Sequence, residues 1–472
     1  MAIVRAALLI DFGSTYTKLR AVDLDRASII GSGQGPSTVT TDINIGLDKA
    51  LADLEHQTGN LPDFVHTLAS SSAAGGLGMV TIGLVPKLTA QAARHAALGA
   101  GAKLIGNYSY ELTDLDISQI EAQRPDMILL CGGTDGGNKA IYLENATRLA
   151  ASKLDCPIVL AGNRSASDAA RQSLCNSGKN AVITENVMPE YLKLNIEPAR
   201  EVIREIFINH IVRAKGIDLA ASRFDEVLMP TPAAVLDATR LLADGTDGTP
   251  GIGPLMLLDI GGATTDVHSI CDGLPPQSSA HFVGLEEPYA KRTVEGDLGM
   301  RHTASDVVAA FGGTEKFAAQ AAMDSGDVDR LLIRCRDEVD WLPECAEARA
   351  FDEALSRAAV EVAVERHAGT HSIVQTVHGP ATVQRGKDLT QIGTIIGTGG
   401  VLVHGTGSRA ALEGALWSAV RPQSLCPKSA EFFLDADYAL YAVGLLAARE
   451  PEVALALGRQ SLKSLSKDQS NG

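Results

Sequence analysis

Runs of apolar residues that end at an aspartate and a glycine turn are the dominant pattern in this chain. In one of them, the apolar residues 255–258 lead into Asp259, two glycines follow, and Asp266 opens a second extended run. The apolar run predicts a buried strand, and the glycines predict a tight turn at which backbone amides can approach a ligand closely. Carboxylates beside such a turn suit hydrated Mg²⁺, although a plain β-hairpin with solvated aspartates fits this segment as well.

A second copy of this pattern lies near the start of the chain. Strands predicted at 6–10 and 17–22 flank a glycine turn that follows Asp11, and Lys18 and Arg20 fall on one face of the second strand. Two such turns predict two related half-domains that face one nucleotide. The predicted phosphate-binding positions are Gly13, Ser14 and Thr15 in this copy and Gly261, Gly262, Thr264 and Thr265 in the other.

A third glycine turn, within residues 395–402, predicts a surface against which a flat adenosine can lie. Its glycines are Gly397, Gly399 and Gly400. In this order, the three segments resemble the phosphate-1, phosphate-2 and adenosine motifs of the actin, heat-shock chaperone and sugar-kinase superfamily. The resemblance implies an α/β, actin-like (ribonuclease H-like) two-lobed ATPase fold, with ATP and Mg²⁺ as cofactors.

Each of the charged residues in these segments has an expected role in ATP hydrolysis, which consists mainly of positioning and charge neutralisation. Asp11 and Asp259 are expected to hold hydrated Mg²⁺. Lys18 is expected to offset developing charge, and Asp266 to orient water. Closing two lobes over the γ-phosphate makes such a fold a switch, since loss of that phosphate releases both turns.

Charge and cysteine content narrow the classes of function. The 472 residues carry a formal net charge of −16, which argues against a nucleic-acid surface and against binding to an anionic membrane. No stretch approaches the apolar length of a membrane span, and the first ten residues are too short for a signal peptide. The seven cysteines are dispersed and form no C-x-x-C pair, so free buried thiols in a reducing cytoplasm are expected.

The middle of the chain alternates between helix and strand and predicts an inserted, Rossmann-like βα region with a parallel sheet. Its predicted strand at 127–130 ends in a glycine-rich run, residues 131–138, which is either a second ligand site or a tight turn that needs glycine. We expect four parts: a first half-domain at 1–86, the βα region with helices and a linker at 87–250, a second half-domain at 251–405, and C-terminal helices that return to the first lobe at 406–472.

Four further segments carry expectations. Residues 31–41 read as a loop, and 190–245 as helical. The serines at 70–72 follow a predicted strand and either bind phosphate beside Asp11 or form a plain loop. Residues 286–301 mix both charges with glycines and read as a loop whose cations meet phosphate, a partner or only solvent; the cations are Lys291, Arg292 and Arg301.

Four motifs together resemble the glutamate mutase accessory family. They are residues 9–18 (LIDFGSTYTK), 68–77 (LASSSAAGGL), 129–138 (LLCGGTDGGN) and 292–301 (RTVEGDLGMR). The resemblance implies kinship to hydantoinase and oxoprolinase enzymes, and a role as a reactivating chaperone beside the subunits of an adenosylcobalamin-dependent mutase. Residues 266–268 begin like a cobalt-ligating D-x-H motif, but Cys271 stands where that motif has glycine, so no bound cobalamin is expected.

Three classes of function stay open at this point. The first is the ATP-driven chaperone, the second a small-molecule kinase or ATP-dependent amidohydrolase, and the third a nucleotide-gated scaffold that barely hydrolyses ATP. The actin-like fold hosts all three. The cognate mutase and the oligomeric state, a homodimer included, are not fixed by the sequence; the βα region is a candidate for docking against the mutase.

Overall fold

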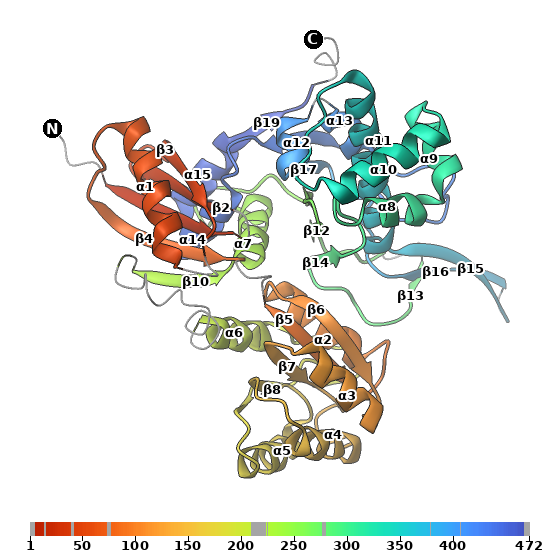
Figure 1. Ribbon diagram of the computed structural model, residues 1–472. Helices are drawn as coiled ribbons and strands as arrows, with labels where there is room; N and C mark the ends of the chain where they lie inside the picture. The colour runs from red at the N-terminus through yellow and green to blue at the C-terminus, as the bar shows by residue number, and fades with distance from the viewer. Residues whose placement is uncertain are drawn as a thin grey trace. The chain divides into compact units, whose positions relative to one another are not determined.

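A computed structural model describes residues 5–13, 16–38, 42–72, 77–208, 223, 225–275, 280–377, 379–405 and 407–466 (Figure 1). The chain divides into two compact units. Unit 1 comprises residues 1–238, 284–288 and 440–457, and unit 2 comprises residues 239–283, 289–439 and 458–472. Each unit is built around its own sheet and its own hydrophobic core.

Unit 1 is organised around a five-stranded sheet with the order β10-β4-β1-β2-β3. β1 is antiparallel to β2 and parallel to β4, β2 is antiparallel to β3, and β4 is parallel to β10. All residues of β1 are buried, as its apolar run predicts. The bounds are β1 Ala6–Phe12, β2 Tyr16–Asp23, β3 Ser28–Pro36, β4 Phe64–Ser71 and β10 Glu226–Pro230.

β3 corrects the expectation of a loop over residues 31–41 for residues 31–36, while residues 39–41 of that expectation lie outside the described residues. Gly31, Gly33 and Gly35 alternate with polar residues, so all three fall on one face of β3, against the helix α1 (Ile43–Thr58). A Cβ atom on Gly33 would lie 2.1 Å from the backbone oxygen of Ala50. The glycines therefore let the helix approach the strand closely, and a composition that is typical of loops here serves packing.

Replacing Gly33 with Ala is expected to destabilise unit 1 by about 2 kcal/mol or more, because the added methyl group meets helix backbone that cannot move away alone. Thermal unfolding followed by circular dichroism measures this effect. Gly326→Ala, in an open part of the helix α10 (Ser325–Asp337), is the matched control and should leave the melting temperature unchanged or slightly raised. Equal melting temperatures for the two variants would contradict the packing argument.

The inserted βα region forms a second, all-parallel sheet with the order β6-β5-β7-β8-β9 (Figure 1). The helices and most strands lie where the alternating pattern predicts them, but β5, which lies between β6 and β7 in the sheet and upstream of residue 87 in the chain, was not predicted. The bounds are β5 Gly78–Gly83, α2 Thr89–Gly99, β6 Lys103–Ser109, α3 Asp114–Gln123, β7 Met127–Leu130, α4 Ala140–Ala151, β8 Ile158–Leu160, α5 Arg164–Asn176 and β9 Ala181–Ile183.

The expectation that residues 190–245 are helical is only partly correct. Helices α6 (Glu197–Ile206) and α7 (Thr231–Asp244) form, but β10 lies between them and joins the first sheet at the edge of β4. The final helices are α14 (Leu440–Ala447) and α15 (Pro451–Ser461). α14 belongs to unit 1, where the Tyr441 hydroxyl donates a hydrogen bond to the Leu9 carbonyl at 3.3 Å, so residues 440–457 return to the first unit.

Unit 2 repeats the core arrangement of unit 1. Its sheet has the order β14-β12-β11-β17-β18-β19; β11 is antiparallel to β12 and parallel to β17, β12 is antiparallel to β14, and β17 is parallel to β18. Two sheets that share one order of three antiparallel and two parallel strands identify the duplicated ribonuclease H-like, actin-like fold that was expected. The bounds are β11 Leu255–Ile260, β12 Thr265–Ile270, β14 Ala290–Glu295, β17 Thr394–Thr398, β18 Glu431–Asp435 and β19 Leu462–Ser464.

β14 corrects the expectation of a loop over residues 286–301. Its charged residues are buried and have partners within the protein: Lys291 donates to the His367 carbonyl at 2.8 Å, and Arg292 pairs with Asp266 at 2.8 Å. Arg301, just beyond the strand, is also buried and pairs with Asp352 at 2.7 Å. Mixed charge here marks internal ion pairs and not a cationic surface.

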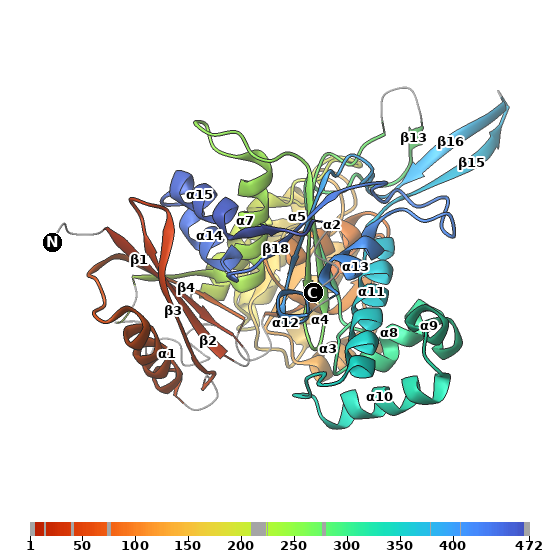
Figure 2. The same ribbon diagram turned by 90° about the horizontal axis from the view of Figure 1, so that it is seen from above.

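The remainder of unit 2 is largely helical, with a three-stranded ribbon of order β13-β16-β15 that extends from it (Figure 2). In the described part of the chain, no helix is long and apolar enough to cross a membrane. The bounds are β13 His281–Phe282, α8 Ala304–Phe311, α9 Thr314–Ala321, α10 Ser325–Asp337, α11 Ala346–His367, β15 Thr370–Thr376, β16 Gly379–Arg385, α12 Gly400–His404, α13 Ser408–Leu412 and a 3₁₀ turn at Glu413–Ala415.

All seven cysteines are free thiols, as the sequence predicts. Four of them are buried, but Cys175 and Cys345 are exposed, so the expectation of burial was wrong for these two.

Candidate functional site

In unit 1, three polar side chains meet at the carboxyl ends of three neighbouring parallel strands. Asp11 lies near the end of β1, Ser70 near the end of β4, and Thr231 directly after β10. The Thr231 hydroxyl donates to Asp11 Oδ1 at 2.5 Å, and the Ser70 hydroxyl lies 3.4 Å from the same oxygen. The carboxyl ends of parallel strands are where open α/β sheets bind ligands, so this cluster is the candidate site of unit 1.

The Asp11 carboxyl is buried, and burial raises its pKa above the ordinary aspartate range. The hydrogen bond from Thr231, the charge of Lys18 and the hydrogen bond from Ser70 each oppose that rise. Lys18 lies directly across the β-hairpin from Asp11 in the β1–β2 register. The neighbouring residues therefore compensate the charge of the Asp11 carboxylate only in part.

The turn between β1 and β2 requires glycine at its first position. The Gly13 amide donates to the Tyr16 carbonyl at 3.0 Å, and a Cβ atom on Gly13 would lie 2.6 Å from that carbonyl oxygen. Ser14 and Thr15, which are predicted to bind phosphate, lie outside the described residues. The serines at 70–72 are all described: Ser70 and Ser71 belong to β4, Ser70 lies beside Asp11 as expected, and the Ser72 amide donates to the Phe12 carbonyl at 3.0 Å.

In unit 2, the equivalent turn between β11 and β12 is closed in the same way. The Gly261 amide donates to the Thr264 carbonyl at 2.9 Å, while the carbonyls of Gly261 and Gly262 accept hydrogen bonds from residues 300–302. No atom lies within 4 Å of the position of a Cβ on Gly262, so this part of the turn is open to a ligand. Thr265 points inward, since it is fully buried and donates to the Leu298 carbonyl at 2.5 Å.

The two aspartates of this hairpin have different surroundings. Asp259 and Asp266 are cross-strand partners, and Thr398 lies beside Asp259 on β17. Asp266 Oδ2 pairs with Arg292 at 2.8 Å, whereas its Oδ1 is buried without a hydrogen-bond partner among the described residues. An unpartnered buried oxygen is costly, and a bound water or ligand would satisfy it.

The three glycines of the adenosine-type turn have different roles. Gly397 lies within β17 and packs under Leu402, so it serves the core. Gly399 has a φ of +94°, and a Cβ atom there would lie 2.3 Å from the Ile260 carbonyl oxygen and 2.9 Å from Asp259 Oδ1. Gly400 opens α12. The turn therefore rests directly on the Asp259 corner.

Two residues at this turn were not found from the sequence. The rings of His404 and Tyr438 lie 5.9 Å apart beside Gly400, and Tyr438 has a φ of +48°, which is unusual for a residue with a side chain. Asp435, at the end of β18, accepts a hydrogen bond from Thr398 at 3.3 Å. The available signal was the apolar run of residues 432–434, which ends at Asp435.

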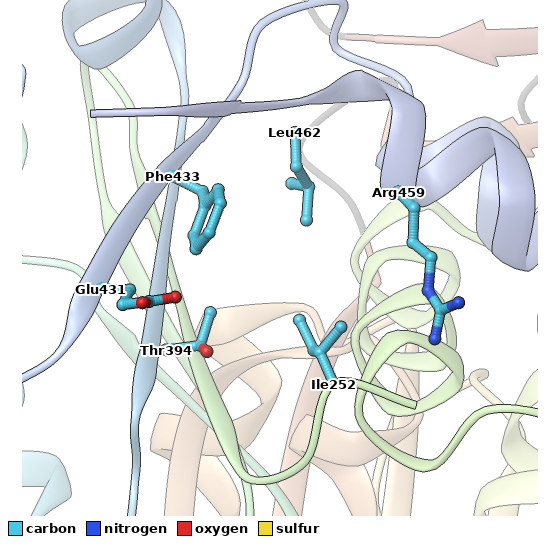
Figure 3. A pocket seen from close by; sticks show the side chains of 6 residues that line it. All are labelled: Ile252, Thr394, Glu431, Phe433, Arg459 and Leu462. Carbon is cyan, nitrogen blue, oxygen red and sulfur yellow. The ribbon is translucent and has the colours of Figure 1, made fainter. Parts of the chain in front are cut away.

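A shallow pocket of about 250 Å³ lies elsewhere in unit 2 (Figure 3). Thr394 and Glu431, the first residues of β17 and β18, line it together with the aromatic ring of Phe433. It therefore opens at the amino ends of the strands, away from Asp259, and it is smaller than most small-molecule sites.

Comparison with known proteins places the chain in a family. A family model described as MutL protein matches residues 7–462. The chain belongs to the MutL protein family. A curated relative of this family, Protein MutL from Clostridium tetanomorphum, is 46% identical over 458 residues, which cover 97% of this chain and 99% of the relative.

Solved structures resemble the chain only distantly. An acetone carboxylase in a nucleotide-free state shares 13% identity, covers 94% of this chain and 70% of its own, and gives a TM-score of 0.38. The xylulose kinase from Bifidobacterium adolescentis shares 12% identity over 96% of this chain and 94% of its own, with a TM-score of 0.33. The fold of this MutL family member is assigned from the strand order of its two sheets alone.

Proposed function

We propose that the chain binds Mg²⁺-ATP and hydrolyses it, with one nucleotide held by both β-hairpin corners. The observation that carries this proposal is the repeated placement of an aspartate, Asp11 in unit 1 and Asp259 in unit 2, near the carboxyl end of the central strand and beside a glycine turn. Each aspartate has hydroxyl neighbours on the adjacent parallel strand, Ser70 and Thr398. Such a repeat is what binding of a polyphosphate from two sides requires.

The residues at these corners fit Mg²⁺. They offer carboxylate and hydroxyl oxygens, the hard ligands this ion prefers, and Asp11 is a buried carboxylate that a cation would stabilise. In the described residues, no group of three or more His, Cys, Asp or Glu side chains could hold a metal by itself. That composition fits an ion that keeps most of its waters and binds through one or two carboxylates and substrate phosphates.

The proposed nucleotide contacts follow from the placement of each residue. The backbone around Gly13 and around Gly261 and Gly262 would hold the phosphates, Lys18 would offset charge, and Asp266 Oδ1 would orient water. In this proposal Gly399 and Gly400 face the adenosine. Thr265 and Gly397 are buried and support the β11–β12 turn and the adenosine-type turn from within the protein. Ser14, Thr15 and Thr264 complete the phosphate-binding set that the sequence predicts.

We further propose that ATP turnover serves a reactivating chaperone role for an adenosylcobalamin-dependent mutase of the glutamate mutase type in the cytoplasm. Support comes from membership of the MutL family over nearly the whole chain. In this role hydrolysis needs no small-molecule acceptor. The energy of hydrolysis instead changes the relative position of the two half-domains, and this change alters how tightly the chain binds the mutase.

A mixed assay tests this function. Purified mutase that has lost activity during turnover is incubated with the chain, Mg²⁺-ATP and fresh adenosylcobalamin, and recovery of mutase activity is measured. We expect recovery with ATP and none with a non-hydrolysable ATP analogue. ATP turnover that rises many-fold with a sugar or a cyclic amide, without recovery of the mutase, would contradict the chaperone role and favour a kinase or amidohydrolase.

Replacing Thr231 with Val is expected to raise the Mg²⁺ concentration needed for half-maximal ATP turnover by about 10- to 100-fold, since partners that orient a metal-binding carboxylate contribute this much. The variant removes the shortest hydrogen bond to Asp11 and keeps the shape of the side chain. Thr147→Val is the matched control, because the Thr147 hydroxyl bonds only to a carbonyl of its own helix at 3.0 Å. Identical Mg²⁺ titrations of the two variants would refute the role of Thr231.

A further inference from the structure

The exposed apolar side chains of the inserted βα region gather at one edge of its sheet. Across residues 78–206, all of which the structure describes, the exposed large apolar side chains are Val85, Tyr110, Leu115 and Tyr191. Val85 follows β5, Tyr110 follows β6, Leu115 lies in the first turn of α3, and Tyr191 follows β9. All four therefore lie at the carboxyl ends of the parallel strands, which we call the carboxyl edge.

The glycine-rich loop after β7, residues 131–138, lies at the same edge and is rigidly held. Asn163 bonds to the backbone of Gly136, Gly137 and Asn138, and Asn186 donates to the Gly133 carbonyl and to Asp135 at 3.0 Å each. The Asp135 amide donates to the carbonyl of Pro189, close to Tyr191 in the chain. This network makes the loop and the segment around Tyr191 one preorganised surface.

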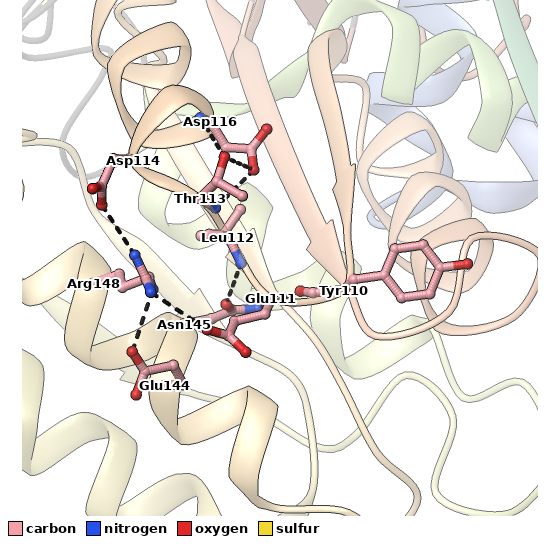
Figure 4. A network of polar contacts seen from close by, with 9 residues as sticks. All are labelled: Tyr110, Glu111, Leu112, Thr113, Asp114, Asp116, Glu144, Asn145 and Arg148. Atoms are coloured by element: carbon pink, nitrogen blue, oxygen red, sulfur yellow. Dashed lines mark hydrogen bonds and ion pairs between the residues drawn. The ribbon is translucent and has the colours of Figure 1, made fainter.

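Tyr110 is held in a strained conformation that presents its ring to solvent. Its φ is +69°, a region that costs about 1–3 kcal/mol for a residue with a side chain, and its side chain is 59% exposed. Asn145 of α4 fixes the backbone that follows, donating to the Tyr110 carbonyl at 2.9 Å and accepting from the Leu112 amide at 2.8 Å. Figure 4 shows the ring directed away from this network. Strain that the surroundings maintain at an exposed aromatic residue indicates a functional role.

Carboxylates surround the exposed residues on this side. Glu111, Asp114 and Glu144 all lie around a single cation, Arg148, at 3.1–3.4 Å, and Asp116 caps α3 beside them (Figure 4). One guanidinium cannot neutralise four carboxylates, so the rim of the apolar patch beside Tyr110 and Leu115 is negative. A partner face with basic residues around an apolar centre is its electrostatic complement.

We propose that the carboxyl edge is the surface on which this chain docks a subunit of its mutase, through a face of that subunit that is apolar and rimmed by Lys or Arg. The edge spans five strands, roughly 20 Å at the usual strand spacing, which suits a protein surface better than a small ligand. Tyrosine is enriched at the centres of protein interfaces, and Tyr110 and Tyr191 are the most prominent side chains here. This proposal rests on the accessory function proposed above.

Binding of the purified mutase subunits to the full-length chain by biolayer interferometry tests the proposal. Tyr110→Gly is expected to weaken binding at least ten-fold while leaving the melting temperature unchanged or higher, because glycine adopts a φ of +69° without strain. Leu115→Glu is expected to weaken binding to a similar extent. Leu342→Glu, at a position in unit 2 that is 73% exposed, is the matched control and should bind like the unaltered chain.

The outcomes separate the docking surface from the function. If the unaltered chain binds the mutase and all three variants bind equally well, the docking surface is wrong while the accessory function stands. If the unaltered chain binds Mg²⁺-ATP but does not bind the mutase, both proposals are overturned. Docking at this edge is supported if Tyr110→Gly and Leu115→Glu bind the mutase more weakly than the unaltered chain while their ATP turnover in the absence of mutase is unchanged. Binding of the unaltered chain should also weaken as the salt concentration is raised.

Discussion

Replacing Asp11 with Asn is expected to lower Mg²⁺-dependent ATP turnover by about 100-fold or more while stabilising the nucleotide-free protein. Loss of a residue that merely orients a metal ligand costs about 10- to 100-fold, so loss of the ligand itself should cost at least as much. Asn keeps the size of the side chain and can still accept the hydrogen bond from Thr231. It removes only the buried charge, and with it the metal site.

The stabilising effect follows from the raised pKa of Asp11. Because burial raises this pKa, the folded state holds the carboxyl proton at pH values at which the unfolded state has released it. Stability of the nucleotide-free chain therefore falls as pH rises through that window, and the loss is complete above the folded-state pKa. The advantage of Asp11→Asn should be absent in acid below the ordinary aspartate pKa and should grow as the pH rises above it.

Thermal unfolding at several pH values, in parallel with ATP turnover, measures both effects. Asp63→Asn, at an exposed position that precedes β4, is the matched control and should change neither quantity. A melting temperature of Asp11→Asn below that of the unaltered chain at neutral pH would show that the ionised carboxylate stabilises the fold, which is the opposite of what its burial predicts.

Replacing Arg301 with Ala is expected to destabilise unit 2 by about 3–5 kcal/mol, the range for breaking one side of a buried ion pair. The Arg301 guanidinium makes two parallel hydrogen bonds to Asp352 of α11 at 3.0 and 2.7 Å, and Trp341 lies against it at 5.3 Å. Its backbone amide also donates to the Gly262 carbonyl at 2.9 Å. Arg301 thus contacts α11 through its side chain and the β11–β12 turn through its backbone.

Urea unfolding of the variant measures the loss of stability, and a matched surface pair calibrates it. Arg330 pairs with Asp327 and Glu347 at 3.2 and 2.7 Å on the exposed surface, so Arg330→Ala should destabilise the chain far less than Arg301→Ala does. Nucleotide affinity should fall in Arg301→Ala and not in Arg330→Ala. Equal free energies of unfolding for both variants would contradict the structural role of Arg301.

The hydrophobic pattern was sufficient to predict the two hairpins and much of the inserted sheet, because their strands are short apolar runs that end at glycine or aspartate. It failed where a residue type serves an unusual purpose. The glycines of β3 admit a helix, and the charges of β14 form internal ion pairs, so both strands read as loops. The pattern of residues along the chain does not show which helix or side chain will pack against a strand in the folded protein.

The candidate site shows the same limit. Asp11 and Ser70 were connected because the actin-like fold that the resemblance implies places the end of the strand before Ser70 beside Asp11. Thr231 was missed, although it makes the shortest hydrogen bond to Asp11, because β10 reaches the sheet from a distant part of the chain that reads as helical. His404 and Tyr438 were missed for a similar reason, since only the folded chain brings them beside Gly400.

The most direct test of the central claim is the number of nucleotides bound per chain, measured by titration calorimetry with Mg²⁺ and a non-hydrolysable ATP analogue. One nucleotide per chain is predicted for the unaltered protein, and both Asp11→Asn and Asp259→Asn should lose it. Two nucleotides per chain, or an Asp259→Asn variant that binds as tightly as the unaltered protein, would contradict a single site shared by the two hairpin corners.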